Sequence, residues 1–204
     1  MGRARRVDPD GAARLVGHGD VLVMSVSPVH GGGPTVIGMR AVRLAGPETL
    51  DIVVPLAELA ETLARALPGR DEPDGAGEVI VPAEHGAGAS WAGTSPPRSG
   101  WVAIGTVDAR TLSARAAAGV AEIVTGSPEG AGAAAVAALR ARVWGRPLVD
   151  DRPELAGLPA GAAFVAEVLG FVVDDEPAVV YRSGPWWRVT TTRGHVLARR
   201  PALG

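Results

Sequence analysis

The stretch AVVYRSGPWWRVTTTRGHVLAR, residues 178–199, indicates how the C-terminal half folds. It contains three short runs of residues that favour β-structure, at 178–182, 186–191 and 195–199. The breaks between these runs, Ser183-Gly184-Pro185 and Arg193-Gly194, hold residues that are preferred in tight turns between antiparallel strands. The stretch therefore predicts a small antiparallel sheet of three strands.

The same stretch holds the strongest candidate for a binding surface. No acidic residue follows Glu176, whereas five arginines do, which gives this segment a charge of about +5. Arginine beside tryptophan is enriched at protein interfaces, and it also suits phosphate contact combined with base stacking. The candidate binding residues are Tyr181, Arg182, Trp186, Trp187, Arg188, Arg193, His195, Arg199 and Arg200.

Three roles of this surface remain open from the sequence. It is a protein interface, a nucleic-acid surface, or a half-buried sheet whose arginines pair with the acidic residues 174–176 of the preceding turn. Because side chains alternate along a strand, we expect Trp186 and Trp187 on opposite faces. One of them is then expected to fill the core, and the other to stay near the surface.

The residues before this sheet predict a short strand at 101–107 and then three helices. Asp108 is a suitable N-cap for the first helix, and Ser127-Pro128-Glu129 is a suitable start for the second. Helical spacing predicts one buried face for each helix. These faces hold Leu112, Ala116 and Val120 in the first helix, Val136, Leu139 and Val143 in the second, and Val165, Val168, Leu169 and Val172 in the third. Three helices followed by strands also describe a winged helix, but residues 162–169 hold no basic side chain for reading a DNA groove.

The N-terminal half is expected to be rich in β-structure. Residues 21–29 and 35–44 favour a hairpin around a glycine-rich loop at 30–34. Further strands are expected at 50–54 and 78–81, and a short opening helix at 8–17. A longer helix is expected from Pro55, with one apolar stripe of Leu56, Leu59, Leu63 and Leu67.

A change of composition marks the expected domain boundary. Residues 84–100 are rich in Gly, Ser and Pro, which is typical of a linker or a long surface loop, although Trp91 and Trp101 are expected to pack against a domain. We therefore predict a β-rich N-terminal domain, residues 1–83, with one or two helices. The C-terminal domain, residues 101–204, is predicted to hold three helices followed by the small antiparallel sheet, so the fold class is α+β.

The composition narrows the class of protein. The chain has 204 residues, of which 47% are hydrophobic, so it can bury a core. Its net charge of −2 gives no overall attraction to nucleic acid or to an anionic membrane. No apolar run approaches the ~20 residues of a membrane span, and the absence of cysteine suits a reducing compartment. A cytoplasmic protein without a membrane partner is expected.

Two glycine-rich turns leave an enzyme or a cofactor binder as an alternative. His30-Gly31-Gly32-Gly33 spells the oxyanion-hole motif of some lipases and esterases, but no G-x-S-x-G nucleophile motif accompanies it. Residues 130–135, GAGAAA, fit a dinucleotide fingerprint, but the further βα units of a parallel sheet do not follow. The four histidines are scattered, so we expect no metal site, no cofactor and no assignable catalytic residue.

Some segments of the chain resemble hypothetical proteins of high-GC actinobacteria. These segments are EGAG at 129–132, AALRARVWGR at 137–146, WWR at 186–188 and RGHVL at 193–197. All 20 basic residues are arginine, and lysine and asparagine, whose codons are AT-rich, are absent. The resemblance implies a GC-rich origin and no particular activity.

The sequence thus predicts a non-catalytic cytoplasmic protein that binds a partner protein, or a second copy of itself, through the C-terminal arginine- and tryptophan-rich sheet. Nucleic-acid binding through the same residues is one alternative. A small enzyme or cofactor binder that uses the glycine-rich turns at 30–34 or 126–132 is the other.

Overall fold

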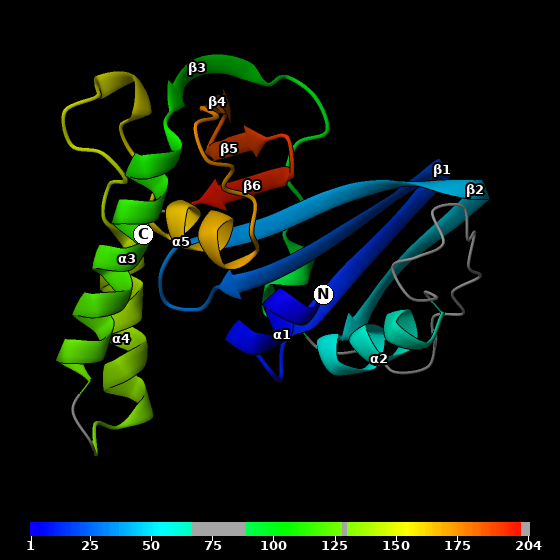
Figure 1. The fold of residues 1–204 in the computed structure, drawn as a ribbon, viewed down its shortest axis with the longest axis horizontal. Coiled ribbons are helices and arrows are strands. Elements are labelled where there is room, and N and C mark those ends of the chain that lie inside the picture. The colour runs from blue at the N-terminus through cyan, green and yellow to red at the C-terminus, as the bar shows by residue number, and fades with distance from the viewer. Residues whose placement is uncertain (67–88, 128–129, 201–204) are drawn as a thin grey trace.

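One antiparallel sheet of six strands, in the order β1-β2-β6-β5-β4-β3, runs through the protein (Figure 1). The computed structural model describes residues 1–66, 89–127 and 130–200. The strands are β1 (Ala12–Val29), β2 (Thr35–Pro55), β3 (Val102–Val107), β4 (Ala178–Ser183), β5 (Trp186–Thr191) and β6 (Gly194–Arg199). The helices are α1 (Gly2–Val7), α2 (Leu56–Ala66), α3 (Ala109–Gly126), α4 (Ala133–Gly145) and α5 (Gly161–Val168), with short 3-10 helices η1 (Ser90–Gly93) and η2 (Pro153–Leu155). The predicted α+β class and the three-stranded C-terminal sheet are confirmed.

The hairpin of β1 and β2 is longer than the sequence predicts. Its glycine-rich loop at 30–34 is where we expect it, but β1 begins at Ala12 and pairs with β2 as far as Pro55. The prediction of a helix at 8–17 is therefore wrong, and the strand predicted at 50–54 is the far end of β2. The physical reason is that Ala13 and Leu15 both enter the core, which requires the two-residue period of a strand.

Helix α2 follows the predicted apolar stripe. Leu56 and Leu59 are buried, and Leu63 packs half-buried against the same cluster. Leu67 and the strand predicted at 78–81 lie outside the described residues.

Pairing between β2 and β6 joins the N-terminal hairpin to the C-terminal strands. Thr35, Ile37 and Met39 lie opposite Arg199, Leu197 and His195. The sheet thus crosses from one predicted domain into the other, and the division into residues 1–83, 84–100 and 101–204 stays a prediction about folding units.

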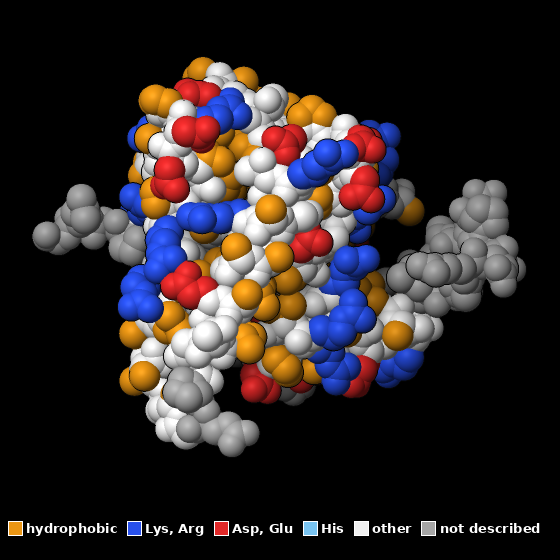
Figure 2. Space-filling view, turned by 60° about the vertical axis from the view of Figure 1, so that its left-hand side comes forward, with side chains coloured by type: hydrophobic (Ala, Val, Ile, Leu, Met, Phe, Trp, Pro, Cys, Tyr) orange, Lys and Arg blue, Asp and Glu red, His pale blue; other side chains and the backbone are white. Residues whose placement is uncertain are grey.

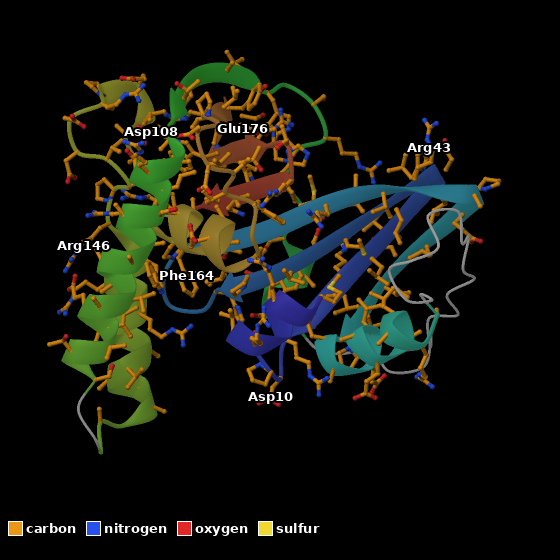
Figure 3. All side chains as sticks on the ribbon, viewed as in Figure 1. Asp10, Arg43, Asp108, Arg146, Phe164 and Glu176 are labelled. Atoms are coloured by element: carbon orange, nitrogen blue, oxygen red, sulfur yellow. The ribbon has the colours of Figure 1, made fainter. Side chains whose placement is uncertain are left out.

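Helices α3, α4 and α5 share a core with one face of the C-terminal strands. Within this core Trp144 of α4 stacks on Phe164 of α5, with ring centroids 4.4 Å apart. Figure 3 labels Phe164 on α5, between α3 and the sheet. Within the described part of the chain, no helix has the length and apolar character needed to cross a membrane.

The start of α3 confirms the predicted N-cap. The backbone N–H of Thr111 donates a hydrogen bond of 2.8 Å to the Asp108 carboxylate, and this bond lowers the pKa of Asp108. Leu112 and Ala116 are buried as expected, but Val120 is 42% exposed. Its predicted place in the core is taken by Gly119, which lies against the ring of Trp144.

Helices α4 and α5 are shorter than expected. α4 begins at Ala133 instead of at 127, although Leu139 and Val143 are buried as predicted. α5 ends at Val168, because Gly170 adopts a φ of +70° and turns the chain out of the helix, so Val172 follows it in a loop.

The close approach of Gly119 to Trp144 predicts the effect of a substitution. Alanine is favoured over glycine in helices by about 1 kcal/mol, but a Cβ at this position would meet Cζ3 of a ring that is 2% exposed. We expect Gly119→Ala to lower the free energy of unfolding by about 1–3 kcal/mol, because the added methyl group overpacks the core. Urea unfolding measures this change. The exposed control Ala118→Gly should lose only about 1 kcal/mol of helix propensity. A stabilised Gly119→Ala variant would contradict this packing.

Candidate functional site

The strand register divides the C-terminal sheet into two faces. Val180, Val189 and Val196 pack in the core with the helices. The residues that alternate with them point to the opposite side, which we call the outer face. Cross-strand neighbours on the outer face form three rows: Thr35, Arg199, Trp186 and Ser183 in the first, Ile37, Leu197, Arg188 and Tyr181 in the second, and Met39, His195, Thr190 and Val179 in the third.

The two neighbouring tryptophans lie on opposite faces, as predicted, but neither is near the surface. Trp187 is 5% exposed in the helix-side core, and Trp186 is 4% exposed on the outer face. Trp186 is covered because Trp91 and Ala92 of η1 pack against it. The expectation of one surface tryptophan is therefore wrong.

The side chain of Arg14 holds the segment that covers Trp186. Its guanidinium donates to the Ala92 carbonyl at 2.8 Å and to the Ser95 hydroxyl at 3.0 Å. It also pairs with both carboxylate oxygens of Asp51, at 2.8 and 2.7 Å, and these bonds lower the pKa of Asp51. The stretch expected to be a linker is therefore fastened to the outer face at this point, and Trp91 packs as expected.

The guanidinium of Arg188 lies between two aromatic rings on the outer face. Its central carbon is 4.3 Å from the ring centroid of Tyr181 and 4.7 Å from that of Trp101. Its Nε is buried and has no hydrogen-bond partner among the described residues. The rings hold the planar group in place, while no carboxylate of the described chain neutralises it.

His195 lies beside Arg188 in the adjoining row. Its Nδ1 is 3.1 Å from the hydroxyl of Thr190. Burial lowers the pKa of His195, and the positive charge of Arg188 lowers it further. The lowered pKa favours the neutral ring at pH 7, where the positive charge of this part of the face comes from Arg188.

The other candidate residues are spread around the sheet. Arg182 stacks on Trp187 on the helix side, at 5.0 Å, and Arg200 donates to the Gly145 carbonyl at 2.9 Å. Arg193 lies in the β5–β6 turn, where its carbonyl accepts a bond of 2.6 Å from Arg40, and Arg199 lies opposite Trp186. Around Arg188 the structure therefore groups Tyr181 and His195, to which it adds Trp101, while Trp186 and Arg199 are paired in the neighbouring row of the outer face.

The expected pairing of these arginines with the turn at 174–176 is not what the structure shows. Glu176 accepts a hydrogen bond of 2.9 Å from the Thr192 hydroxyl, and no ion pair among the described residues joins an arginine to this turn. On the face seen in Figure 2, basic and acidic side chains are interspersed over most of the surface.

The glycine-rich turns serve packing and chain direction. A Cβ on Gly33 would lie 2.9 Å from the Cα of Ala141, so the loop at 30–34 needs glycine to approach α4. In the glycine-rich turn at 126–132, Gly130 has a φ of +86°, which favours glycine. A Cβ on Gly126 would lie 2.8 Å from the side chain of Leu139. Over the described part of the chain, no group of three or more His, Asp or Glu side chains is placed to hold a metal ion.

The structure also has a broad groove that the sequence did not predict. It lies on the helix side of the β1–β2 hairpin and has a volume of about 1410 Å³. Its lining comes from α1, both long strands, α2, the end of α5 and the β5–β6 turn. Because these segments are far apart in the chain, no spacing motif could have indicated it.

Two family models match the chain, and they meet in the stretch expected to be a linker. Residues 96–203 match the model described as Domain of unknown function (DUF8185), and residues 1–93 match Domain of unknown function (DUF8010). No curated protein matches the sequence. The expected membership in a family of unassigned activity is thereby supported, while the actinobacterial origin stays a prediction.

One solved structure with a detectable likeness is the DNA polymerase sliding clamp from Pseudomonas aeruginosa with ligand. The sequence identity is 13%, the TM-score is 0.41, and the alignment covers 96% of this chain and 58% of the clamp chain. The chain thus spans little more than half the length of that protein. At this TM-score the likeness identifies neither the fold nor a function.

The lowered pKa of His195 predicts acid sensitivity. The unfolded chain, with a histidine pKa of about 6.5, takes up this proton more readily than the folded chain, so stability is lost as the pH falls below that value. We expect His195→Gln to lose less stability between about pH 7 and pH 5 than the wild type, measured by urea unfolding. The exposed His18→Gln is the matched control. Equal acid sensitivity of His195→Gln and wild type would show that this ring is not kept neutral by the fold.

Proposed function

We propose that this chain, which belongs to the DUF8185 family, is a non-catalytic cytoplasmic protein that binds an acidic group of a partner protein on its outer face. The observation that carries the proposal is the guanidinium of Arg188, held between Tyr181 and Trp101 without a carboxylate partner among the described residues.

The geometry of Arg188 suits recognition of a carboxylate. A guanidinium presents a planar fork of N–H donors that can bind both oxygens of a carboxylate. Stacking between two rings fixes the plane of this fork, so little conformational entropy is lost when a ligand binds. Nε is buried, so an incoming carboxylate would accept hydrogen bonds from the terminal N–H groups of this half-buried side chain and stabilise its charge.

The arrangement favours a protein partner over nucleic acid. Base stacking requires free aromatic faces, but Trp186 and Trp187 are buried, and Arg188 already covers one face each of Tyr181 and Trp101. Phosphate binding along a strand of nucleic acid would also use several arginines on one surface, whereas Arg182 and Arg200 bond on the helix side.

Titration with tetraglutamate tests the proposal, because this probe carries carboxylates and no apolar anchors. The ring signal of His195 in NMR reports binding, since a carboxylate at Arg188 should raise the pKa of that ring. Arg188→Gln is expected to weaken binding by about tenfold or more through loss of a charged hydrogen-bonded pair.

Arg182→Gln is the matched control, because Arg182 also stacks on a tryptophan but faces the helix side. Its affinity for tetraglutamate should equal that of the wild type. If Arg188→Gln binds as tightly as Arg182→Gln, the outer-face proposal is wrong. Sedimentation of the free chain at several concentrations will show whether a second copy supplies the acidic group, in which case association should be lost in Arg188→Gln alone.

A further inference from the structure

The groove on the helix side of the β1–β2 hairpin has an apolar floor. Leu15, Val26 and Leu59 are buried there. Around them Leu22, Met24 and Ile52 pack half-buried against the same cluster. Met24 and Leu22 lie opposite Arg40 and Val42, so the floor continues along both strands. Apolar side chains that remain half-exposed in a concave surface are typical of a binding site.

The rim of the groove is basic. Its charged lining consists of one acid, Glu48, and five arginines, Arg3, Arg6, Arg40, Arg43 and Arg193. Within the described residues, Arg43 has an exposed ion pair with Asp20 at 3.4 Å, while no ion pair joins the other four to a carboxylate. The lining therefore has an excess of four positive side-chain charges, which favours an acidic occupant.

One rim arginine is fixed in position before anything binds. The Nε of Arg40 donates to the Arg193 carbonyl at 2.6 Å, and its guanidinium lies 5.5 Å from the ring centroid of Phe171. Its terminal nitrogens have no hydrogen-bond partner among the described residues. A ligand carboxylate can therefore be bound with little loss of side-chain freedom.

The size of the groove suits a peptide better than a small molecule. Its volume of about 1410 Å³ exceeds the roughly 300–1,000 Å³ of small-molecule pockets. One part of the β2 lining runs from Gly38 to Leu44, which is about 20 Å at the rise of a strand, and β2 lines the groove again as far as Ile52. A helix of about 13 residues has that length. Arg43 lies at the end of this course that is remote from the 30–34 loop of the hairpin (Figure 3).

Because its apolar floor is recessed, the groove suits a helix as a binding partner better than a membrane surface. An interfacial protein inserts a projecting apolar face into the bilayer. Here the apolar residues lie below exposed arginines, and the side chain of Arg43 is 84% exposed. A flat bilayer would meet the rim first, whereas the apolar face of a single helix can reach the floor.

We propose that this groove binds an amphipathic helix of another protein, with its apolar face on the floor and acidic residues against the arginine rim. This site lies on the side of the sheet opposite to the outer face, so it does not depend on the binding proposed for Arg188.

The test uses a synthetic 14-residue peptide of Leu, Ala and Glu, with leucines at positions 1, 4, 5, 8, 11 and 12, labelled for fluorescence anisotropy with the full chain. We expect binding that weakens as salt is added, because exposed charges are screened. Arg3→Glu with Arg43→Glu, one change from each end of the rim, should reduce affinity by about tenfold or more. Met24→Gln, in the floor, should also reduce it, with circular dichroism confirming that the variant is folded.

Three controls make the result decisive. Arg140→Glu, exposed on α4 outside the groove, and Arg188→Gln on the outer face should both bind as the wild type does. A peptide of the same composition with scrambled leucines should bind at least tenfold more weakly, because it presents no apolar face. Equal binding of the scrambled peptide, or full affinity in the doubly charge-reversed variant, overturns the proposal. The proposal is also overturned if the chain sediments with vesicles of anionic phospholipid and does not bind the peptide.

Discussion

The pairing of β2 with β6 is the interaction on which the rest of the structure depends. It brings residues 35–39 against residues 195–199 and so turns a hairpin and a separate set of strands into one sheet. A strand at the edge of either part would otherwise leave a row of backbone N–H and C=O groups unpaired. Both candidate sites depend on the pairing of β2 with β6. The outer face places Met39 of β2 beside His195, and the groove places Arg40 of β2 against the carbonyl of Arg193.

The joined sheet has a different environment on each side, and this difference explains the chemistry of its arginines. The helix side carries the Trp144–Phe164 core at one end and the open groove at the other. On the outer face the 89–95 segment, held by Arg14, covers Trp186 and also packs with Ile37 and Leu197, which lie in the row that contains Arg188. Arg188 is therefore partly desolvated and stacked, whereas the rim arginines of the groove stay in water. Charge that is fixed and partly buried gives specificity, while exposed charge mainly assists encounter.

Local features of the chain were predictable from the sequence, and contacts between distant segments were not. Gly184, Pro185 and Gly194 place the C-terminal turns correctly, and Asp108 caps α3 as expected, because these effects act within a few residues. The helix predicted at 8–17 failed because pairing with the far end of β2 overrides local propensity. Three residues of the outer-face site were predicted, Tyr181, Arg188 and His195, whereas Trp101, which directly precedes the edge strand β3, was not assigned to it. The groove gathers six segments and has no signal in the sequence.

Hydrogen exchange of backbone amides in the full chain tests the central claim, that the two halves are one sheet, most directly. We predict that the amides of β2 at 35–39 and of β6 at 195–199 open together, and that they exchange as slowly, and with the same dependence on denaturant, as the amides of β5. Fast exchange of the 35–39 amides at a free energy well below that of β5 and β6 would contradict it. The hairpin would then be a separate unit, and neither binding face would be held as described.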